Sequence, residues 1–340
     1  MSIRSYTRAV LLLAAALTLS LAPGEKPVII RLATLVPVGS PWYDVLEDVV
    51  SEWHEISANR VQVRLYPGGV AGDERDLITK MRIDHLQAAA MSATGVSEID
   101  LGIWGLSLPM LLQEYNQLDW LRAQLADELE QRIERGGFIV LGWVDVGWMY
   151  WFSKDPIRRP EDLQKQRIFT WSTGPNVEGM WRSAGFHSVS IAATDVLPAL
   201  QTGLVDAIAA TPLTAATFQW FALANHMTPI KWSVMTGAIV ITKRAWERIP
   251  AELRPRLLAA TRRQLKGVKD ELRNMDDKAV AVMKEHGLQI VSVTEEDRRV
   301  WRTLMDEHIH KLRGLLTDTT MYDMIMGLRE QMPAPARSSP

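Results

Sequence analysis

The chain of 340 residues contains no cysteine, which excludes a disulfide framework, a lipid-modified N-terminal cysteine, and thiolate metal sites or nucleophiles. It also lacks an excess of one charge, because 38 lysines and arginines accompany 40 aspartates and glutamates. The formal net charge is -2, so nothing draws the chain to a phosphate backbone, and nucleic acid is not an expected partner. Phenylalanine and tyrosine are scarce at 6 each, whereas tryptophan occurs 13 times. Tryptophan joins a large apolar ring to one N–H donor, so some of these rings are candidates for lining a ligand site.

The N-terminus carries a mostly apolar run over residues 9–21, which follows Arg4 and Arg8 and ends in a short segment with Pro23. This pattern is typical of a secretory signal peptide and predicts residues 1–24 as that peptide. The run is shorter than the roughly 20 residues that a membrane span needs. An uncleaved anchor remains the alternative, because proline is an awkward residue beside a cleavage site. The sequence therefore predicts an exported protein.

Strand-like and helical runs alternate after the signal peptide, which is the pattern of an α/β protein with a largely parallel sheet covered by helices. A chain of this length exceeds what one small core organises, so two lobes are expected. The predicted strands cover residues 28–34, 61–66, 88–92, 138–144, 148–153, 167–171, 188–191, 205–210 and 237–242. The predicted helices cover residues 41–56, 72–86, 118–133, 176–184, 194–202, 251–287 and 295–316.

The predicted domain division places residues 25–146 and 231–260 in lobe I. Residues 147–230 and 261–330, with the C-terminal helices, form lobe II, and residues 331–340 form a disordered tail rich in proline and serine. The helix over 251–287 is roughly 50 Å long at about 1.5 Å per residue, long enough to span both lobes.

Aromatic side chains are concentrated between residues 138 and 212, in strings that carry few fixed charges. The run FIVLGWVDVGWMYWFS is followed by RIFTWSTGP and then by DVLPALQTGLVDAIAATP. Apolar side chains with few charges favour a concave binding site over a catalytic centre.

Four strings resemble one family: VIIRLATLVPVGSPWYDVLEDVVSEW, VRLYPGGVAGDERDLITKMR, DPIRRPEDLQKQRI and LPALQTGLVDA. They are similar to the DctP-type solute-binding subunits of tripartite ATP-independent periplasmic (TRAP) transporters. The resemblance runs from residue 28 to about residue 287. It implies a two-lobed clamshell that traps a solute and delivers it to a membrane permease, with a long helix crossing both lobes.

Two departures from the family pattern concern the site. Most relatives carry an arginine after the PEDL turn, where it pairs with the solute's carboxylate, and Phe169 stands at that position here. Typical members also carry a polar run after LQTGLVD, whereas this chain has residues 207–211, Ala-Ile-Ala-Ala-Thr. Burying a carboxylate without a cation costs several kcal/mol, so we expect a largely hydrophobic ligand, and a lipid-like molecule is one candidate. The alternative is a carboxylate solute bound by Arg167, two residues away on the same strand face.

The departures resemble a subgroup whose permeases work with a periplasmic tetratricopeptide-repeat (TPR) protein, which is therefore a further expected partner. Thr211 and Pro212 follow a strand at the end where open α/β sheets place ligands. The predicted ligand-binding residues are Phe169, Trp171, Trp148, Tyr150, Thr211, Pro212, Met91, Ser92, Trp220 and Met235.

Catalytic patterns are weak, so we expect no enzyme activity, no cofactor and no metal. In the DEHIH string, His308 and His310 lie two apart on a predicted helix and face different directions. Asp145, within the aromatic run, is the one candidate general base. It leaves open an enzyme, or a lipid-shuttling protein, on the same fold.

Overall fold

The computed structural model describes residues 26–171, 178, 181–182 and 184–335. Within this part of the chain, one mixed sheet has the strand order β2-β1-β3-β8-β4-β7-β5-β6, and β9 pairs with β8. The strands are β1 (Val28–Thr34), β2 (Val61–Tyr66), β3 (Ala88–Ser92), β4 (Phe138–Ser153), β5 (Arg167–Trp171), β6 (His187–Ile191), β7 (Ala207–Ala210), β8 (His226–Thr242) and β9 (Gln289–Ile290).

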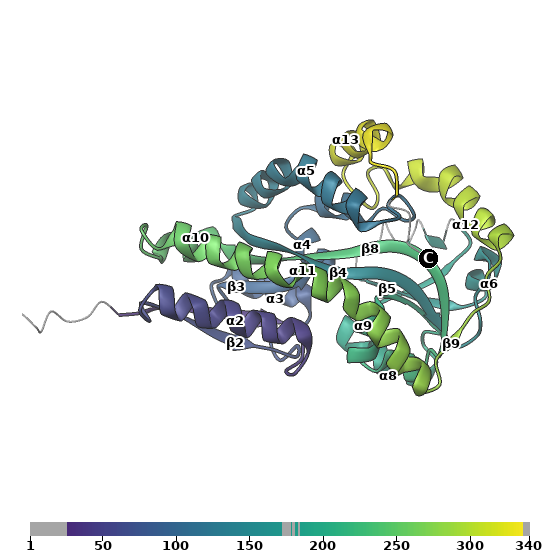
Figure 1. Ribbon diagram of the computed structural model, residues 1–340, viewed down its shortest axis with the longest axis horizontal. Coiled ribbons are helices and arrows are strands. Elements are labelled where there is room, and N and C mark those ends of the chain that lie inside the picture. Colours follow the sequence, from purple (N-terminus) through teal and green to yellow (C-terminus); the bar gives the residue numbers. More distant parts are fainter. Residues whose placement is uncertain (1–25, 172–177, 179–180, 183, 336–340) are drawn as a thin grey trace, which may run out of the picture.

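Helices flank this sheet along most of the chain (Figure 1). The α-helices are α2 (Pro41–Ile56), α3 (Glu74–Arg82), α4 (Ala93–Ser97), α5 (Tyr115–Arg135), α6 (Pro160–Gln164), α8 (Val196–Thr202), α9 (Pro212–Thr217), α10 (Lys243–Arg248), α11 (Arg254–Glu285), α12 (Glu295–His308) and α13 (Thr319–Leu328). Short 3-10 helices are η1 (Leu101–Ser107), η2 (Ala193–Asp195), η3 (Trp220–Ala222), η4 (Ile309–Leu312) and η5 (Arg329–Gln331).

The centre of the sheet is antiparallel, which corrects the expectation of a largely parallel sheet. β4 and β8 are 16 and 17 residues long and pair with each other over their length. The predicted strands 138–144 and 148–153 are thus one strand, and the predicted strand 237–242 is the end of a longer one. β3 pairs with the last residues of β8, and β7 pairs with the last residues of β4. Parallel pairs remain on both sides, so β4 and β8 join two parallel halves.

A register shift near the middle of β4 coincides with the expected boundary between the lobes. It lies between Asp145 and Gly147, and Gly147 has a φ of +137°. A side chain is strained at this φ, and a Cβ would also come within 2.5 Å of Asp276 Oδ2. Only glycine therefore fits this point of the strand, where α11 approaches closely.

The long helix α11 crosses the molecule from α10 to β9, as the resemblance implied (Figure 1). It packs beside α2, where Trp53 Nε1 donates a 2.9 Å hydrogen bond to Thr261 Oγ1. It also lies directly over β4, because Gly142 has no side chain: a Cβ there would be 2.5 Å from Leu265 Cδ1.

Other helix boundaries differ modestly from the predictions. The predicted helix 72–86 is limited to α3, which begins after Asp73 in a reciprocal N-terminal cap. The predicted helix 295–316 ends at His308 and continues as η4. The predicted helix 176–184 lies largely outside the described residues, and the predicted signal peptide lies wholly outside them. No described helix combines the length and the apolar character needed to cross a bilayer.

Much of the tryptophan content forms a core beneath α12. Trp232 contacts Trp151, Trp181 and Trp301, with ring centroids 5.4, 6.2 and 5.8 Å apart. Trp301 Nε1 donates a 2.8 Å hydrogen bond to the Arg158 carbonyl, which satisfies the polar atom of a nearly fully buried ring. These tryptophan side chains therefore pack against one another in the core.

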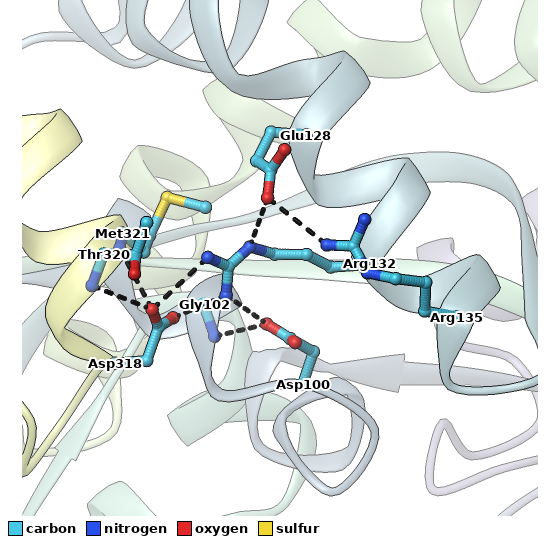
Figure 2. A network of polar contacts seen from close by, with 8 residues as sticks. All are labelled: Asp100, Gly102, Glu128, Arg132, Arg135, Asp318, Thr320 and Met321. Carbon is cyan, nitrogen blue, oxygen red and sulfur yellow. Dashed lines mark hydrogen bonds and ion pairs between the residues drawn. The ribbon is translucent and has the colours of Figure 1, made fainter.

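The C-terminal helix α13 is tied to α5 by a network around Arg132 (Figure 2). The Arg132 guanidinium donates to Asp318 at 2.8 Å, to Glu128 at 2.7 Å and to Asp100 at 3.5 Å. Asp318 also caps α13 by accepting from the N–H groups of Thr320 and Met321.

The chain after α13 returns to α5. The carbonyls of residues 333 and 334 accept hydrogen bonds from Gln117 and Asn116 at 3.1 and 2.9 Å. The predicted tail is therefore held against the protein over its first residues, because α5 offers amide donors there.

Candidate ligand-binding cavity

An apolar cavity lies under α11, between the two parallel halves of the sheet. It encloses about 880 Å³ of empty space, counted to its open mouth. From β1 and the residues after it, from α2, α3 and β3, and from the inner parts of β8 and β4, it is lined by Thr34, Leu35, Val36, Trp42, Val45, Leu46, Glu74, Ala90, Met91, Ser92, Met235, Ala238, Ile239, Val144 and Val146. From α11 and the segment around α9, it is lined by Leu265, Leu272, Ala193, Thr214, Phe218 and Trp220.

The lining carries almost no charge. Among the described residues that line this cavity, Glu74 is the one ionisable side chain, and no lysine, arginine or histidine is present. Burial raises the pKa of Glu74, against hydrogen bonds that act to lower it. Its carboxylate accepts from the Ser92 N–H and hydroxyl, both at 2.7 Å, and from the Gly95 N–H at 2.8 Å. Glu74 thus joins α3 to the start of α4 and adds no positive potential to the cavity.

The mouth of the cavity is narrowed by contacts between the loop after β2 and η2. The Asp73 carboxylate accepts a hydrogen bond from the Ala193 backbone, and burial raises the pKa of this carboxyl. A Cβ on Gly69 would lie 3.3 Å from the Thr194 methyl carbon, so the Thr194 side chain already lies close to the Gly69 backbone. The two sides of the cleft therefore meet in this structure.

Four of the predicted ligand-binding residues lie together on the cavity wall. Met91 and Ser92 come from the end of β3, Met235 from the middle of β8, and Trp220 from η3. These positions meet because β3 pairs with β8, while η3 closes the cavity from the opposite half.

Three other predicted residues lie one layer behind the wall. Phe169 is 2% exposed and packs edge-on to Trp220, with ring centroids 6.4 Å apart, so Trp220 stands between it and the cavity. Thr211 is fully buried and caps α9 through Thr214, whose N–H is 3.1 Å from Thr211 Oγ1. Pro212 is the buried first residue of the same helix. A capping threonine has its hydroxyl engaged locally, and Thr214, whose Oγ1 lies 2.8 Å from Thr211 Oγ1, is the residue of this pair that lines the cavity.

Trp148 and Tyr150 do not line the cavity. Trp148 packs against Tyr115 of α5, with centroids 5.3 Å apart, and the Lys231 ammonium lies 4.9 Å from its ring centre. Tyr150 is half-buried in the packing around β4, where burial raises the pKa of its hydroxyl. The register shift at Gly147 turns these side chains away from the face that carries Val144 and Val146. The side chain of Trp171 lies outside the described part of the structure.

Arg167 does not line the cavity, so the alternative of a carboxylate solute bound by Arg167 is wrong. Its guanidinium donates to both oxygens of Asp206 at 2.6 and 2.9 Å, and its side chain is 54% exposed. Burial acts to raise the pKa of Asp206, but the hydrogen bonds and charges of Arg167 and Lys154 outweigh it and lower that pKa. Arg167 is the first residue of β5, at the opposite end of the strand from the cleft.

Asp145 is held in an ion-pair network and is not a free general base. Its carboxylate accepts from Arg122 and from Arg273, the latter at 2.9 and 2.5 Å. Arg273 also donates to Asp119 at 2.9 and 2.6 Å. In the described part of the chain, no three histidine, aspartate or glutamate side chains are grouped to hold a metal. His308, from the DEHIH string, instead contacts the Leu304 carbonyl at 2.9 Å through Nδ1.

Sequence reasoning missed several wall residues, above all Trp42 and Phe218. The apolar periodicity of the helix over residues 41–56 places Trp42 on its buried face with Val45 and Leu46, and in the structure all three line the cavity. The spacing of apolar residues is the same whether that face of the helix packs against a core or lines a cavity. The spacing alone therefore could not identify Trp42 as a wall residue. Phe218 stacks on Trp220, with ring centroids 5.2 Å apart, at a site that no motif marks.

Asp276 links α11 to the start of α9 beside the cavity. It is 8% exposed, and its Oδ1 accepts from the Leu213 N–H at 3.1 Å. Burial raises the pKa of Asp276 to about 7, although backbone hydrogen bonds from Leu213 and Trp148 act to lower it. A buried acid with this pKa makes stability depend on pH near neutrality.

We expect Asp276→Asn to remove that dependence. Because the folded pKa lies above the unfolded value of 3.8, the folded protein holds the proton more tightly, and this stabilisation is lost as the pH rises from about 4 to about 7. The stability of the variant relative to wild type should therefore rise with pH in this window, by at most about 1.4 kcal/mol per pH unit. Urea unfolding of both proteins at pH 5, 6, 7 and 8 measures the difference. Asp277→Asn, at the exposed neighbouring position, is the control, and a constant difference between Asp276→Asn and wild type would contradict the assignment.

Comparison with known proteins agrees with the fold and the family resemblance. Residues 32–314 match the model of the DctP family, bacterial extracellular solute-binding protein family 7. A relative is the C4-dicarboxylate-binding periplasmic protein DctP of Rhodobacter capsulatus, 22% identical over 301 residues that cover 86% of this chain and 88% of the relative.

Solved structures with the same architecture include two TRAP periplasmic solute-binding proteins. One, from Desulfovibrio salexigens with bound orotic acid, has a TM-score of 0.81 at 17% identity and covers 90% of this chain and 98% of its own. The other, from Sulfurospirillum deleyianum with bound succinate, has a TM-score of 0.80 at 18% identity and covers 88% and 98%. The fold and the cavity define a two-lobed solute-binding protein. The chain belongs to the DctP family of bacterial extracellular solute-binding proteins, as its sequence strings predicted.

Proposed function

We propose that this protein captures a largely hydrophobic solute in the periplasm and delivers it to the membrane permease of a TRAP-type transporter. The observation that carries the proposal is the lining of the cavity, which is apolar except for Thr34, Glu74, Ser92 and Thr214. A ligand with large apolar surface gains roughly 25 cal/mol for each Å² removed from water. Burying about 300 Å² therefore contributes on the order of 7 kcal/mol before the ligand and the lobes are ordered.

The same lining disfavours the small anions bound by relatives. An ionised carboxylate enters a dry site only where a cation and further donors replace its hydration, and otherwise costs several kcal/mol. Here the one ionisable group that lines the cavity is itself an acid, Glu74. Succinate and orotic acid, which are bound in structures of the same fold, would meet no compensating charge at this wall.

Lobe closure supplies the expected capture mechanism. The lining comes from both halves of the sheet, so a bound ligand contacts both and favours the closed arrangement. We propose that the lobes divide near Gly147, where the register of β4 shifts and Asp276 contacts the strand. The expected lobe I, residues 25–146 and 231–260, then carries β1, β2 and β3.

The proposed function requires export of the chain and partner proteins at the membrane. Residues 1–24 have the pattern of a signal peptide, which directs the chain to the periplasm. The permease partner is supported by the family, and a TPR partner by the replacement of the usual arginine with Phe169.

The direct test is to identify what the protein carries. The mature chain is purified from its own host without denaturation and analysed by native mass spectrometry and by organic extraction. We expect a mass increment that disappears after extraction and a recovered molecule that is mainly apolar. Recovery of a dicarboxylate or a sugar acid as the bound species would refute the hydrophobic assignment.

A further inference from the structure

A second cavity lies on the α5 side of α11, separate from the ligand-binding cavity. It encloses about 550 Å³ of empty space, counted to its mouth, between α5, β4 and α11. Val144, Leu265 and Leu272 line both cavities and form the wall between them. Most of its other lining residues are charged: Arg122, Arg262, Lys266, Lys269 and Asp145, which are accompanied by Trp143 and Gly142.

Positive charge exceeds negative charge around this cavity. Four cations and one acid line it, and the neighbouring ion pairs add Arg273, Asp119 and Glu130. The total is five cations and three acids, which leaves +2 (5 - 3). Arg262 pairs with Glu130 at 2.9 Å and Lys269 with Asp119 at 3.0 Å, whereas Lys266 forms no ion pair within the described residues. Like charges held this close repel one another unless a counter-charge enters.

Two buried donors beside this cavity are also unused. Within the described structure, Arg122 Nε and Trp143 Nε1 are both shielded from water and have no hydrogen-bond acceptor. A buried donor without an acceptor is unfavourable. Arg122 is placed by its contact with Asp145, and its side chain is 13% exposed, so its guanidinium is fixed before any ligand arrives.

We propose that this second cavity binds a small oxyanion, a phosphate-like or carboxylate group. Guanidinium and ammonium groups are the donors that such a group needs, and charge-assisted hydrogen bonds are the strong ones. The anion neutralises the excess positive charge among α5, β4 and α11. It ties these three elements together next to the hinge at Gly147.

The test uses the mature protein freed of its natural ligand and titrated with sodium phosphate at constant ionic strength, balanced with sodium chloride. Isothermal calorimetry and the unfolding temperature are recorded. We expect saturable phosphate binding that raises the unfolding temperature. Lys266→Gln and Arg122→Gln should each weaken this binding by roughly tenfold.

The matched control is Lys278→Gln, an exposed lysine of the same helix that lines neither cavity. It removes the same charge and should change phosphate affinity by less than about twofold. Parallel titrations with sulfate and acetate distinguish the source of the group: saturation by phosphate and sulfate alone indicates an inorganic oxyanion, and saturation by acetate indicates a carboxylate. The proposal is refuted if none of these anions acts differently from chloride, or if Lys266→Gln and Lys278→Gln weaken binding equally.

Discussion

Phe218→Ala is expected to weaken binding of the neutral apolar probe N-phenyl-1-naphthylamine about thirtyfold, which corresponds to roughly 2 kcal/mol. Phe218 lines the cavity and stacks on Trp220, so its ring offers one face to the ligand. The ring is only partly buried without ligand, so its removal should cost binding more than folding. Probe fluorescence titrated against protein gives the dissociation constant.

Phe221→Ala is the matched control for this experiment. Phe221 lies in the adjacent 3-10 helix and is also partly buried, but it does not line the cavity. Its truncation should leave probe affinity within about twofold of wild type, because no ligand contact is lost. Equal weakening by both variants would show that the probe binds elsewhere or senses general loosening of this segment.

Arg273→Met is expected to lower the free energy of unfolding by about 3 kcal/mol. The Arg273 guanidinium is 10% exposed, joins Asp145 to Asp119, and lies 4.1 Å from the ring centre of Tyr115. Burial acts to lower its pKa, but the two carboxylates outweigh burial and raise it, so it remains a cation. Methionine keeps much of the apolar stem and removes the charge, which leaves buried Asp145 with Arg122 alone. Urea unfolding at pH 7 measures the loss.

Arg262→Met makes the same chemical change three turns earlier in the same helix. The Arg262 side chain is 46% exposed and pairs with Glu130, so its loss should cost less than about 1 kcal/mol. Both variants are measured in Tris chloride without phosphate or sulfate, so that anion binding does not contribute. Similar losses from the two substitutions would mean that the Asp145 network is no more important to stability than a surface ion pair.

The candidate site was only partly predictable from the sequence. The alternation of side chains over residues 167–171 assigns them to two faces of a strand. It does not reveal that Trp220 lies between Phe169 and the cavity. Trp148 was assigned to the wall from its strand position, whereas the register shift at Gly147 directs it toward α5. The second cavity had no sequence signal, because Arg122 of α5 meets there three cations of α11 that lie far from it in the chain.

The sequence by itself determined the family, the alternation of strands and helices, the long crossing helix and the scarcity of charge near the site. These follow from local periodicity, from composition and from short strings that neighbouring residues carry. The tertiary structure alone decided that β4 and β8 pair antiparallel, which side chains face the cavity, and that Arg167 and Asp145 are committed to ion pairs. Strand register and ion pairing join residues far apart in the chain, and their free energy depends on burial and distance, which exist only once the chain has folded.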